Sequence, residues 1–174
     1  MIKIKKNKGI LFWITGLSGS GKTSIGKAIT QEITKKYGPT IEISGDDIRE
    51  IFNYDKYSKK YRLIYALSYS KYCKYITDKN INIVFSTVSM FHEIRNWNKK
   101  YIENYLEIYI KSDIEKLISK KQKFFYSGIH KDIVGKNQNA EFPKKPHIIL
   151  DNDFTISINK LSKKLLKKIY KSEL

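Results

Sequence analysis

The stretch Ile10-Leu-Phe-Trp-Ile-Thr-Gly-Leu-Ser-Gly-Ser-Gly-Lys-Thr23 decides the fold of this chain of 174 residues. It begins with an apolar run, Ile10 to Thr15, and continues into the pattern G-x-x-x-x-G-K-T between Gly16 and Thr23. A short apolar run that ends at a turn signal is typical of a strand buried on both faces. The next residues carry apolar side chains at helical spacing, and Gly38-Pro39 ends a predicted helix over 22–36. The stretch therefore predicts a buried strand, a glycine-rich loop and a helix.

The glycine-rich loop has the composition of a phosphate-binding site. Its glycines let successive backbone N–H groups point inward, which makes an anion nest at the N-terminus of the following helix. In this pattern Lys22 reaches the outer phosphates of a nucleoside triphosphate and the Thr23 hydroxyl ligates Mg²⁺. The alternative is an ordinary strand-to-helix turn, but the full pattern in this context rarely arises by chance. We expect ATP and Mg²⁺ here, with ATP bound by Gly16, Leu17, Ser18, Gly19, Ser20, Gly21, Lys22, Thr23 and Ser24.

The rest of the chain alternates apolar runs with stretches of helical period, and no linker or internal repeat interrupts them. This alternation predicts one α/β domain over 1–174, with the three-layer fold of P-loop NTPases and a parallel sheet of five strands. The strands are expected at 10–15, 40–44, 81–86, 105–110 and 147–150. The helices are expected at 22–36, 46–52, 58–78, 90–98, 112–120 with Ser112 as N-cap, and 158–170. Ligands of such sheets bind at the carboxyl ends of the strands.

A second polar cluster, Gly45-Asp46-Asp47-Ile48-Arg49, directly follows the second predicted strand. A carboxylate beside a phosphate loop can accept a proton from a hydroxyl or hold the water shell of a metal ion. An arginine can bind an acceptor phosphate through two parallel hydrogen bonds. The same residues are equally typical of a helix N-cap pair followed by a surface arginine. Taken alone, the cluster leaves both interpretations open.

The net charge of +17 suggests nucleic acid as a partner. Only Arg49, Arg62 and Arg95 are arginines, so 31 of the 34 basic residues are lysines, and they are scattered along the chain. A surface that reads bases would be expected to use the arginine fork more often. We therefore expect solvated lysines and no nucleic-acid partner, although the positive field should speed the arrival of polyphosphates.

No apolar run is long enough for a signal segment or a membrane span, so a cytoplasmic protein without a membrane partner is expected. Cys73 is the only cysteine, which rules out a disulfide within the chain.

Together the two motifs resemble those of adenylylsulphate kinase. The hallmark segments of that family are a W-[LI]-T-G-L-S-G-[AS]-G-K-[ST] loop and an L-D-G-D-N-[VI]-R stretch, which Trp13 to Thr23 and Ile43 to Arg49 match at similar spacing. Weaker matches follow along nearly the whole chain, at Phe52-Asn53, Asp55, Ser58, Arg62, Ser86 to Ser89, Gly135, Glu141 to Pro143, and Pro146. The resemblance implies that ATP phosphorylates the ribose 3′-hydroxyl of a nucleotide acceptor.

The same resemblance assigns roles to individual residues. Asp46 falls on the proposed general base, Lys22 is the second catalytic residue, and Thr23 and Asp46 are the metal ligands. Lys120 aligns with an arginine that stacks on the ATP base, and 121–145 with a mobile lid that excludes water. Family members often pair, so a homodimer is expected. The expected acceptor-binding residues are Asp46, Arg49, Asn53, Arg62, Val88, Ser89 and Lys123, although the sequence around Lys123 is equally typical of a solvated lysine.

Departures from the family pattern concern the acceptor. Ser44 replaces an aspartate, Tyr65 replaces an asparagine and Met90 replaces a proline, while the phosphate loop is kept. This pattern is expected if ATP is retained and the second nucleotide is not adenylyl sulfate. The changes resemble those of cytidine diphosphoramidate kinases of bacterial capsule phosphoramidate synthesis, which is the leading interpretation.

Three other functions stay open. One is an adenylylsulphate kinase that makes 3′-phosphoadenylyl sulfate. Another is a nucleotide-binding module without catalytic activity. The third is a nucleic-acid-dependent ATPase, but the third predicted strand ends in Val84-Phe-Ser86 and lacks the Walker B-like Asp-Glu expected of such an ATPase.

Overall fold

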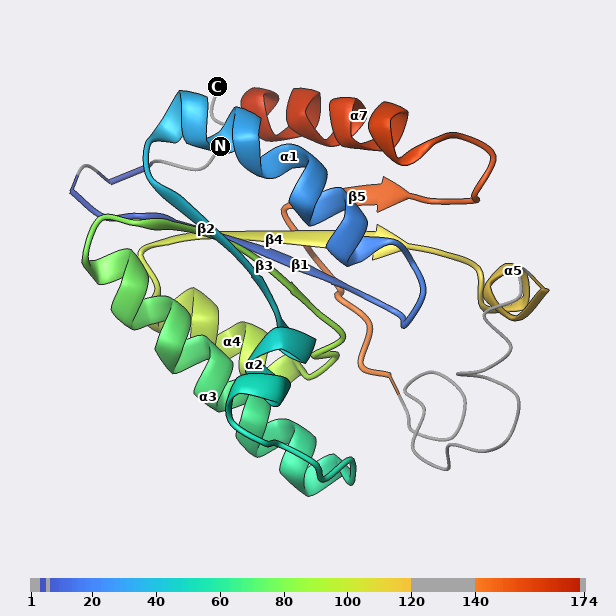
Figure 1. The fold of residues 1–174 in the computed structure, drawn as a ribbon, viewed down its shortest axis with the longest axis horizontal. Coiled ribbons are helices and arrows are strands. Elements are labelled where there is room, and N and C mark those ends of the chain that lie inside the picture. The colour runs from blue at the N-terminus through green and yellow to red at the C-terminus, as the bar shows by residue number, and fades with distance from the viewer. Residues whose placement is uncertain (1–3, 6, 120–139, 173–174) are drawn as a thin grey trace.

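The computed structural model describes residues 4–5, 7–119 and 140–172. Within them, five strands form one parallel sheet in the order β2-β3-β1-β4-β5, and helices cover both of its faces (Figure 1). The α/β fold expected from the sequence, with its five-stranded parallel sheet, is therefore confirmed. In chain order the elements are β1 (Ile10–Gly16), α1 (Lys22–Tyr37), β2 (Thr40–Ser44), α2 (Gly45–Ile51), α3 (Lys59–Asp78), β3 (Asn82–Thr87), α4 (His92–Tyr101), β4 (Asn104–Lys111), α5 (Ile114–Ser119), β5 (Ile148–Asp151) and α7 (Ile158–Lys171).

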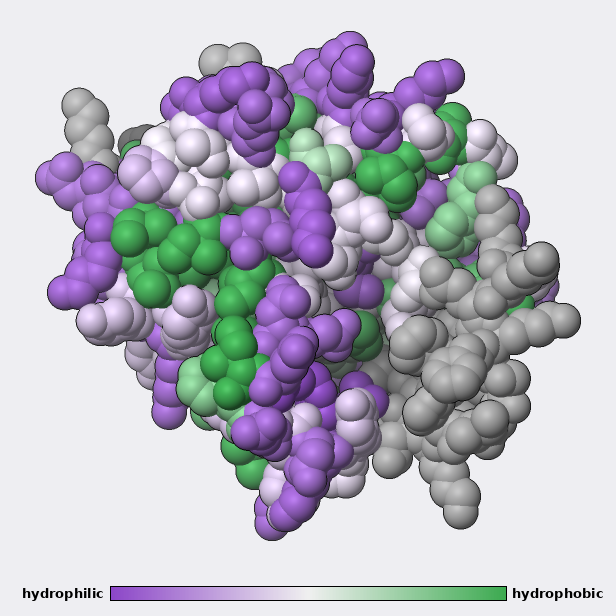
Figure 2. All heavy atoms as spheres, in the orientation of Figure 1, coloured by the Kyte–Doolittle hydropathy of each residue, from purple (hydrophilic) through white to green (hydrophobic). Residues whose placement is uncertain are grey.

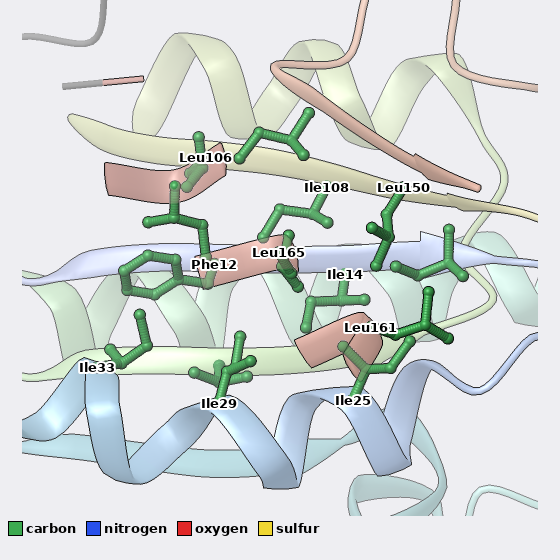
Figure 3. Close-up of a cluster of buried hydrophobic side chains, with 14 of the residues drawn as sticks. Phe12, Ile14, Ile25, Ile29, Ile33, Leu106, Ile108, Leu150, Leu161 and Leu165 are labelled. Atoms are coloured by element: carbon green, nitrogen blue, oxygen red, sulfur yellow. The ribbon is translucent and has the colours of Figure 1, made fainter. Parts of the chain in front are cut away.

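The core lies in two layers, one on each face of the sheet. Side chains alternate along a strand, so Phe12 and Ile14 of β1 point to one face while Leu11 and Trp13 point to the other. The first layer packs α1 and α7 against the sheet (Figure 3), and the second packs α3 and α4 against it. Every residue of β1 is buried, because this central strand is covered on both faces, as its apolar run predicts.

The register of the sheet brings several strand ends to one level. Thr15 of β1 pairs with Thr87 of β3, and Ser44 of β2 pairs with Ser86 of β3. The segments that follow these strands are the glycine loop, α2 and residues 88–91. All three therefore emerge side by side at the carboxyl edge of the sheet, where such folds bind ligands.

Two predicted helix starts were wrong. The helix expected to begin at Ser112 begins at Ile114, because the Asp113 carboxylate accepts the backbone N–H groups of Glu115 and Lys116 at 2.7 and 3.1 Å. A carboxylate competes well for the cap position, and the Ser112 hydroxyl is buried with no hydrogen-bond partner among the described residues.

The second wrong start is that of the helix expected from Met90, which begins at His92. Met90 and Phe91 are instead buried in two different core clusters, with Phe91 in an extended conformation. Most of the predicted lid, 121–139, lies outside the described residues. The part from 140 leads to β5 (orange in Figure 1).

The lysines of the two outer helices lie on solvated faces. Hydrophilic side chains gather over α1 and α7 in the view of Figure 2. The exposed lysines of these two helices are Lys27, Lys35, Lys36, Lys160, Lys163, Lys164, Lys167, Lys168 and Lys171. In the parts of the chain that the structure describes, no helix combines the length and apolar character needed to cross a bilayer.

The contribution of α7 to the first core layer can be tested at Leu165, because the Leu165 side chain is fully buried in that layer. Leu165→Ala should lower the free energy of unfolding by about 2–5 kcal/mol, because it removes buried methyl groups and leaves a cavity. Urea denaturation measures the change. Lys164→Ala, on the exposed side of the same turn, should shift it by no more than about 0.5 kcal/mol, and an equal loss in both variants would contradict this packing.

Candidate functional site

The glycine loop presents backbone groups to a cavity at the end of β1. Gly19 and Gly21 have φ angles of 78° and 89°, which other residues rarely adopt. At Gly16, a β-carbon would lie 2.6 Å from the Ile110 carbonyl oxygen, so a larger residue cannot occupy this position unless the backbone moves. Gly21 caps α1 without a side-chain hydrogen bond. The N–H groups of the first turn of α1 are therefore available to an anion.

Lys22 is buried beneath this loop. Its ammonium donates a hydrogen bond of 2.6 Å to the Leu17 carbonyl oxygen. Burial lowers the pKa of Lys22 to about 8, and the nearby Asp46 carboxylate opposes this shift only in part. An anion bound in the loop would favour the charged form again. The Lys22 ammonium is thus positioned beside the backbone N–H groups of the loop, where it can bind the same anion.

Asn152 supports the loop from the end of β5, and sequence reasoning missed it. Its side-chain amide donates to the Ser20 carbonyl oxygen at 3.0 Å, and its side-chain oxygen accepts the Phe154 N–H at 3.0 Å. Only 2% of Asn152 is exposed. The one available signal was a polar residue directly after the fifth predicted strand, at the ligand-binding edge of the sheet.

The two aspartates of the second cluster have different surroundings. The Asp47 carboxylate accepts the Ser44 N–H and hydroxyl at 2.7 and 2.8 Å, while the Ser44 hydroxyl accepts the Asp47 N–H. This reciprocal capping box begins α2. Asp47 therefore has a capping role, but as the N3 residue of the box, and the N-cap itself is Ser44. Asp46 takes no part in the box and is exposed toward the ends of the strands.

Two adjoining cavities meet at Asp46. The first, here called the loop cavity, is lined by Ser18, Gly19, Gly21, Lys22, Thr23, Ser24, Gly45, Asp46, Ser86, Thr87 and Val88. The second, here called the arginine cavity, is lined by Gly45, Asp46, Arg49, Tyr57, Arg62, Ala66, Tyr69, Thr87, Val88, Ser89, Met90 and Phe91. Gly45, Asp46, Thr87 and Val88 form the wall that both share. A group bound in one cavity therefore lies next to a group bound in the other, with a carboxylate between them.

Arg49 and Arg62 are both arranged around Tyr57. The Arg49 guanidinium lies 4.2 Å from the centre of the Tyr57 ring and donates to the Lys56 carbonyl oxygen at 3.0 Å. Arg62 donates through Nε to the Tyr57 carbonyl oxygen at 2.7 Å. Stacking and backbone contacts of this kind fix the planes of the two guanidinium groups. The cavity thus has two oriented cationic groups suited to phosphate oxygens.

The remaining predicted site residues are placed as follows. Leu17 and Ser20 belong to the loop but are buried and do not line the loop cavity. Asn53 lines an adjoining hollow, which shares Asp46, Arg49 and Tyr57 with the arginine cavity. Val88 and Ser89 line the arginine cavity. Lys120 and Lys123 lie outside the described residues.

Comparison with known proteins identifies relatives along the whole chain. The family model for adenylylsulphate kinase matches residues 8–151. A cytidine diphosphoramidate kinase from Campylobacter jejuni subsp. jejuni serotype O:2 is 34% identical over 168 residues, which cover 94% of this chain and 98% of the relative. An adenylyl-sulfate kinase from Clostridium kluyveri is 27% identical over 157 residues, which cover 87% of this chain and 79% of the relative.

The fold also matches solved structures. The APS kinase of Mycobacterium tuberculosis, solved in complex with AMPPNP and APS, superposes with a TM-score of 0.82 at 21% sequence identity. The match covers 94% of this chain and 98% of that protein. At this identity the likeness establishes the fold alone.

The pKa of Lys22 leads to a pH prediction for ATP binding. Charged Lys22 attracts phosphate, and with a pKa of about 8 in the unliganded protein its protonated fraction falls roughly tenfold between pH 7 and pH 9. The association constant for ATP at saturating Mg²⁺ should fall by a similar factor, as measured by isothermal titration calorimetry.

The control for this titration is Lys22→Met, which has no ammonium group. It should bind ATP weakly and with little dependence on pH over the same interval. An equal pH dependence in both proteins would mean that Lys22 does not govern the affinity.

Proposed function

The chain belongs to the adenylylsulphate kinase family, and we propose that it is an ATP-dependent kinase that phosphorylates the ribose 3′-hydroxyl of cytidine diphosphoramidate. The observation that carries the proposal is the position of Asp46 on the wall shared by the loop cavity and the arginine cavity. A carboxylate between adjoining cavities can accept the proton of a hydroxyl bound in one while that hydroxyl attacks a phosphorus atom bound in the other.

On the donor side, the loop cavity supports binding of the ATP phosphates. Backbone N–H groups of the loop and of the first turn of α1 surround the cavity, and the Lys22 ammonium lies beneath them. Phosphoryl transfer needs little covalent help from the protein, so holding the phosphates and balancing their charge is the main task of this cavity. Ser86 supports the arrangement because its hydroxyl donates to the Lys22 carbonyl oxygen at 3.3 Å.

The side chains of the loop cavity fit a Mg²⁺ ion that accompanies ATP. Among the described residues, no group of three or more His, Cys, Asp or Glu side chains could hold a metal on its own. Mg²⁺ in kinases is usually held by one or two protein groups together with phosphates and water. The Thr23 hydroxyl and the Asp46 carboxylate, which both line the cavity, would be those groups. The bound ion supplies positive charge that neutralises the phosphate oxygens.

On the acceptor side, the arginine cavity supports binding of a nucleotide with a phosphate-rich bridge. Arg49 and Arg62 would bind the bridge, and Tyr57, between them, offers an aromatic face. Val88 and Ser89, which also line this cavity, would contact the acceptor. A ribose hydroxyl placed beside Asp46 would then face the loop cavity, which is the arrangement that in-line transfer requires.

The choice of a cytidine acceptor rests on the Campylobacter jejuni relative, which this chain matches over almost its full length. The three departures from the family pattern also have structural roles around the arginine cavity. Ser44 caps α2, Tyr65 stacks on Tyr54 with ring centres 4.1 Å apart, and Met90 accepts the Thr15 hydroxyl on its sulfur. The product would serve capsular phosphoramidate synthesis. Adenylyl sulfate is the alternative acceptor, and the homodimer and cytoplasmic location stay predictions.

The role of Asp46 is tested by replacing it without changing its size. Asp46→Asn should lower kcat by roughly 10²–10⁴-fold, because the general base is lost, while ATP affinity at saturating Mg²⁺ should fall far less, because the loop backbone, Lys22 and Thr23 are kept. Steady-state kinetics and calorimetry separate the two effects. Asp47→Asn is the matched control, since it keeps an oxygen for the Ser44 N–H and should retain activity. Equal loss of turnover in both variants would contradict the assignment.

The acceptor is tested with a panel of nucleotides in a coupled ATP-consumption assay, with the position of the new phosphate assigned by phosphorus NMR. Cytidine diphosphoramidate should give the highest kcat/KM and a 3′-phosphorylated product. A higher kcat/KM for adenylyl sulfate would establish the alternative acceptor. ATP turnover that requires DNA or RNA and no nucleotide acceptor would contradict the kinase proposal altogether.

A further inference from the structure

Arg95 is a charged residue placed inside the protein. Only 4% of it is exposed, and its Nε atom lies 3.4 Å from Oε1 of Glu107 on β4, which is 1% exposed. Burying such a pair costs solvation energy, so its other polar atoms need partners. Arg95 Nη2 donates to the carbonyl oxygen of Glu141 and lies 2.6 Å from Nδ1 of His92. The buried pair, between α4 and β4, thus contacts the segment that precedes β5.

Glu141 makes three hydrogen bonds to the segment 90–95, two of them with residues 90–92 and one with Arg95. Its carbonyl oxygen accepts from Arg95, its N–H donates to the Met90 carbonyl oxygen at 3.1 Å, and its carboxylate accepts the His92 N–H at 2.5 Å. The second carboxylate oxygen lies 3.9 Å from the Lys59 ammonium of α3. Glu141 thereby links α3, α4 and the segment that follows β3, all of which are distant from it in sequence.

The contact with His92 completes a helix terminus. Phe91, the N-cap of α4, makes no side-chain cap hydrogen bond. The carboxylate of Glu141 takes that place from 49 residues away. A negative group at this end also interacts favourably with the helix dipole. The start of α4 is therefore fixed by a residue of another segment.

Met90, whose carbonyl oxygen accepts the Glu141 N–H, belongs to a segment that forms one wall of the arginine cavity. Val88, Ser89, Met90 and Phe91 all line that cavity. Met90 and Val88 also pack with Leu17 of the glycine loop and with Ala140, the neighbour of Glu141. Displacement of this segment would change the shape of the arginine cavity, because four of its residues line that cavity.

We propose that Glu141 is a positioning residue for the acceptor: it holds residues 88–92 in the conformation that forms the acceptor wall, with Arg95 as its anchor in the core. The proposal rests on the proposed function in that the arginine cavity receives the acceptor. Glu141 does not itself line the cavity and acts through the backbone of residues 90–92.

Kinetics of Glu141 variants test the proposal. Glu141→Ala should raise KM for the acceptor about tenfold, the effect expected from losing a charge-assisted hydrogen bond, with KM for ATP and kcat within about twofold. Glu141→Gln, which can still accept the His92 N–H, should recover most of the loss. Glu93→Ala removes a carboxylate from the same turn of α4 without touching residues 88–92 and is the control. Equal rises in both KM values, or none, would overturn the proposal.

Hydrogen exchange of the unliganded protein gives a readout that does not depend on the acceptor. Backbone amides of residues 88–92 should exchange about tenfold faster in Glu141→Ala than in the wild type, while those of α1 are unchanged. Unchanged exchange at 88–92 would overturn the proposal even if activity fell. If the wild type phosphorylates no nucleotide, the proposed function fails, and the exchange experiment alone decides whether Glu141 orders this segment.

Discussion

The alignment of strand ends at the carboxyl edge of the sheet is the constraint on which the site depends. Parallel hydrogen bonding sets Thr15 beside Thr87 and Ser44 beside Ser86, so three connections leave the sheet at one level. One is a loop whose glycines turn backbone N–H groups toward a cavity. The others bring Asp46 and residues 88–91 to the walls of that cavity and its neighbour. The chemistry follows because a parallel sheet gathers segments that are distant in sequence.

Neighbouring residues of the site have different roles. Asp47 is occupied in capping α2, and this fixed helix start leaves Asp46 directed at the shared wall. The buried Lys22 ammonium similarly has a hydrogen-bond partner, the Leu17 carbonyl oxygen, in the absence of a bound anion. This contact offsets the cost of burying the charge. Each functional group is thus positioned by a contact that also satisfies the hydrogen bonds of the fold.

The sequence predicted what depends on local pattern. The buried β1, the glycine loop and α1 follow from residues adjacent in the chain, and so does the parallel sheet that these elements imply. The contributions of Asn152, Arg95 and Glu141 could not be found in this way, because each acts on a segment distant in sequence. The predicted start of α5 was wrong because Ser112 and Asp113 are both good capping residues, and the sequence alone does not decide between them. In the structure Asp113 caps the helix. Asn53 follows α2 and lines a hollow that shares Asp46, Arg49 and Tyr57 with the arginine cavity, and its role at the acceptor stays a prediction.

The central claim is that donor and acceptor occupy two cavities that meet at Asp46. A crystal structure of the protein with AMPPNP, Mg²⁺ and cytidine diphosphoramidate tests it directly. The account predicts the ribose 3′-oxygen about 3–3.5 Å from the γ-phosphorus, in line with the bond to be broken. It also predicts an Asp46 carboxylate oxygen within about 2.6–3.2 Å of that hydroxyl. An acceptor bound away from the arginine cavity, or an Asp46 side chain turned from both nucleotides, would contradict it.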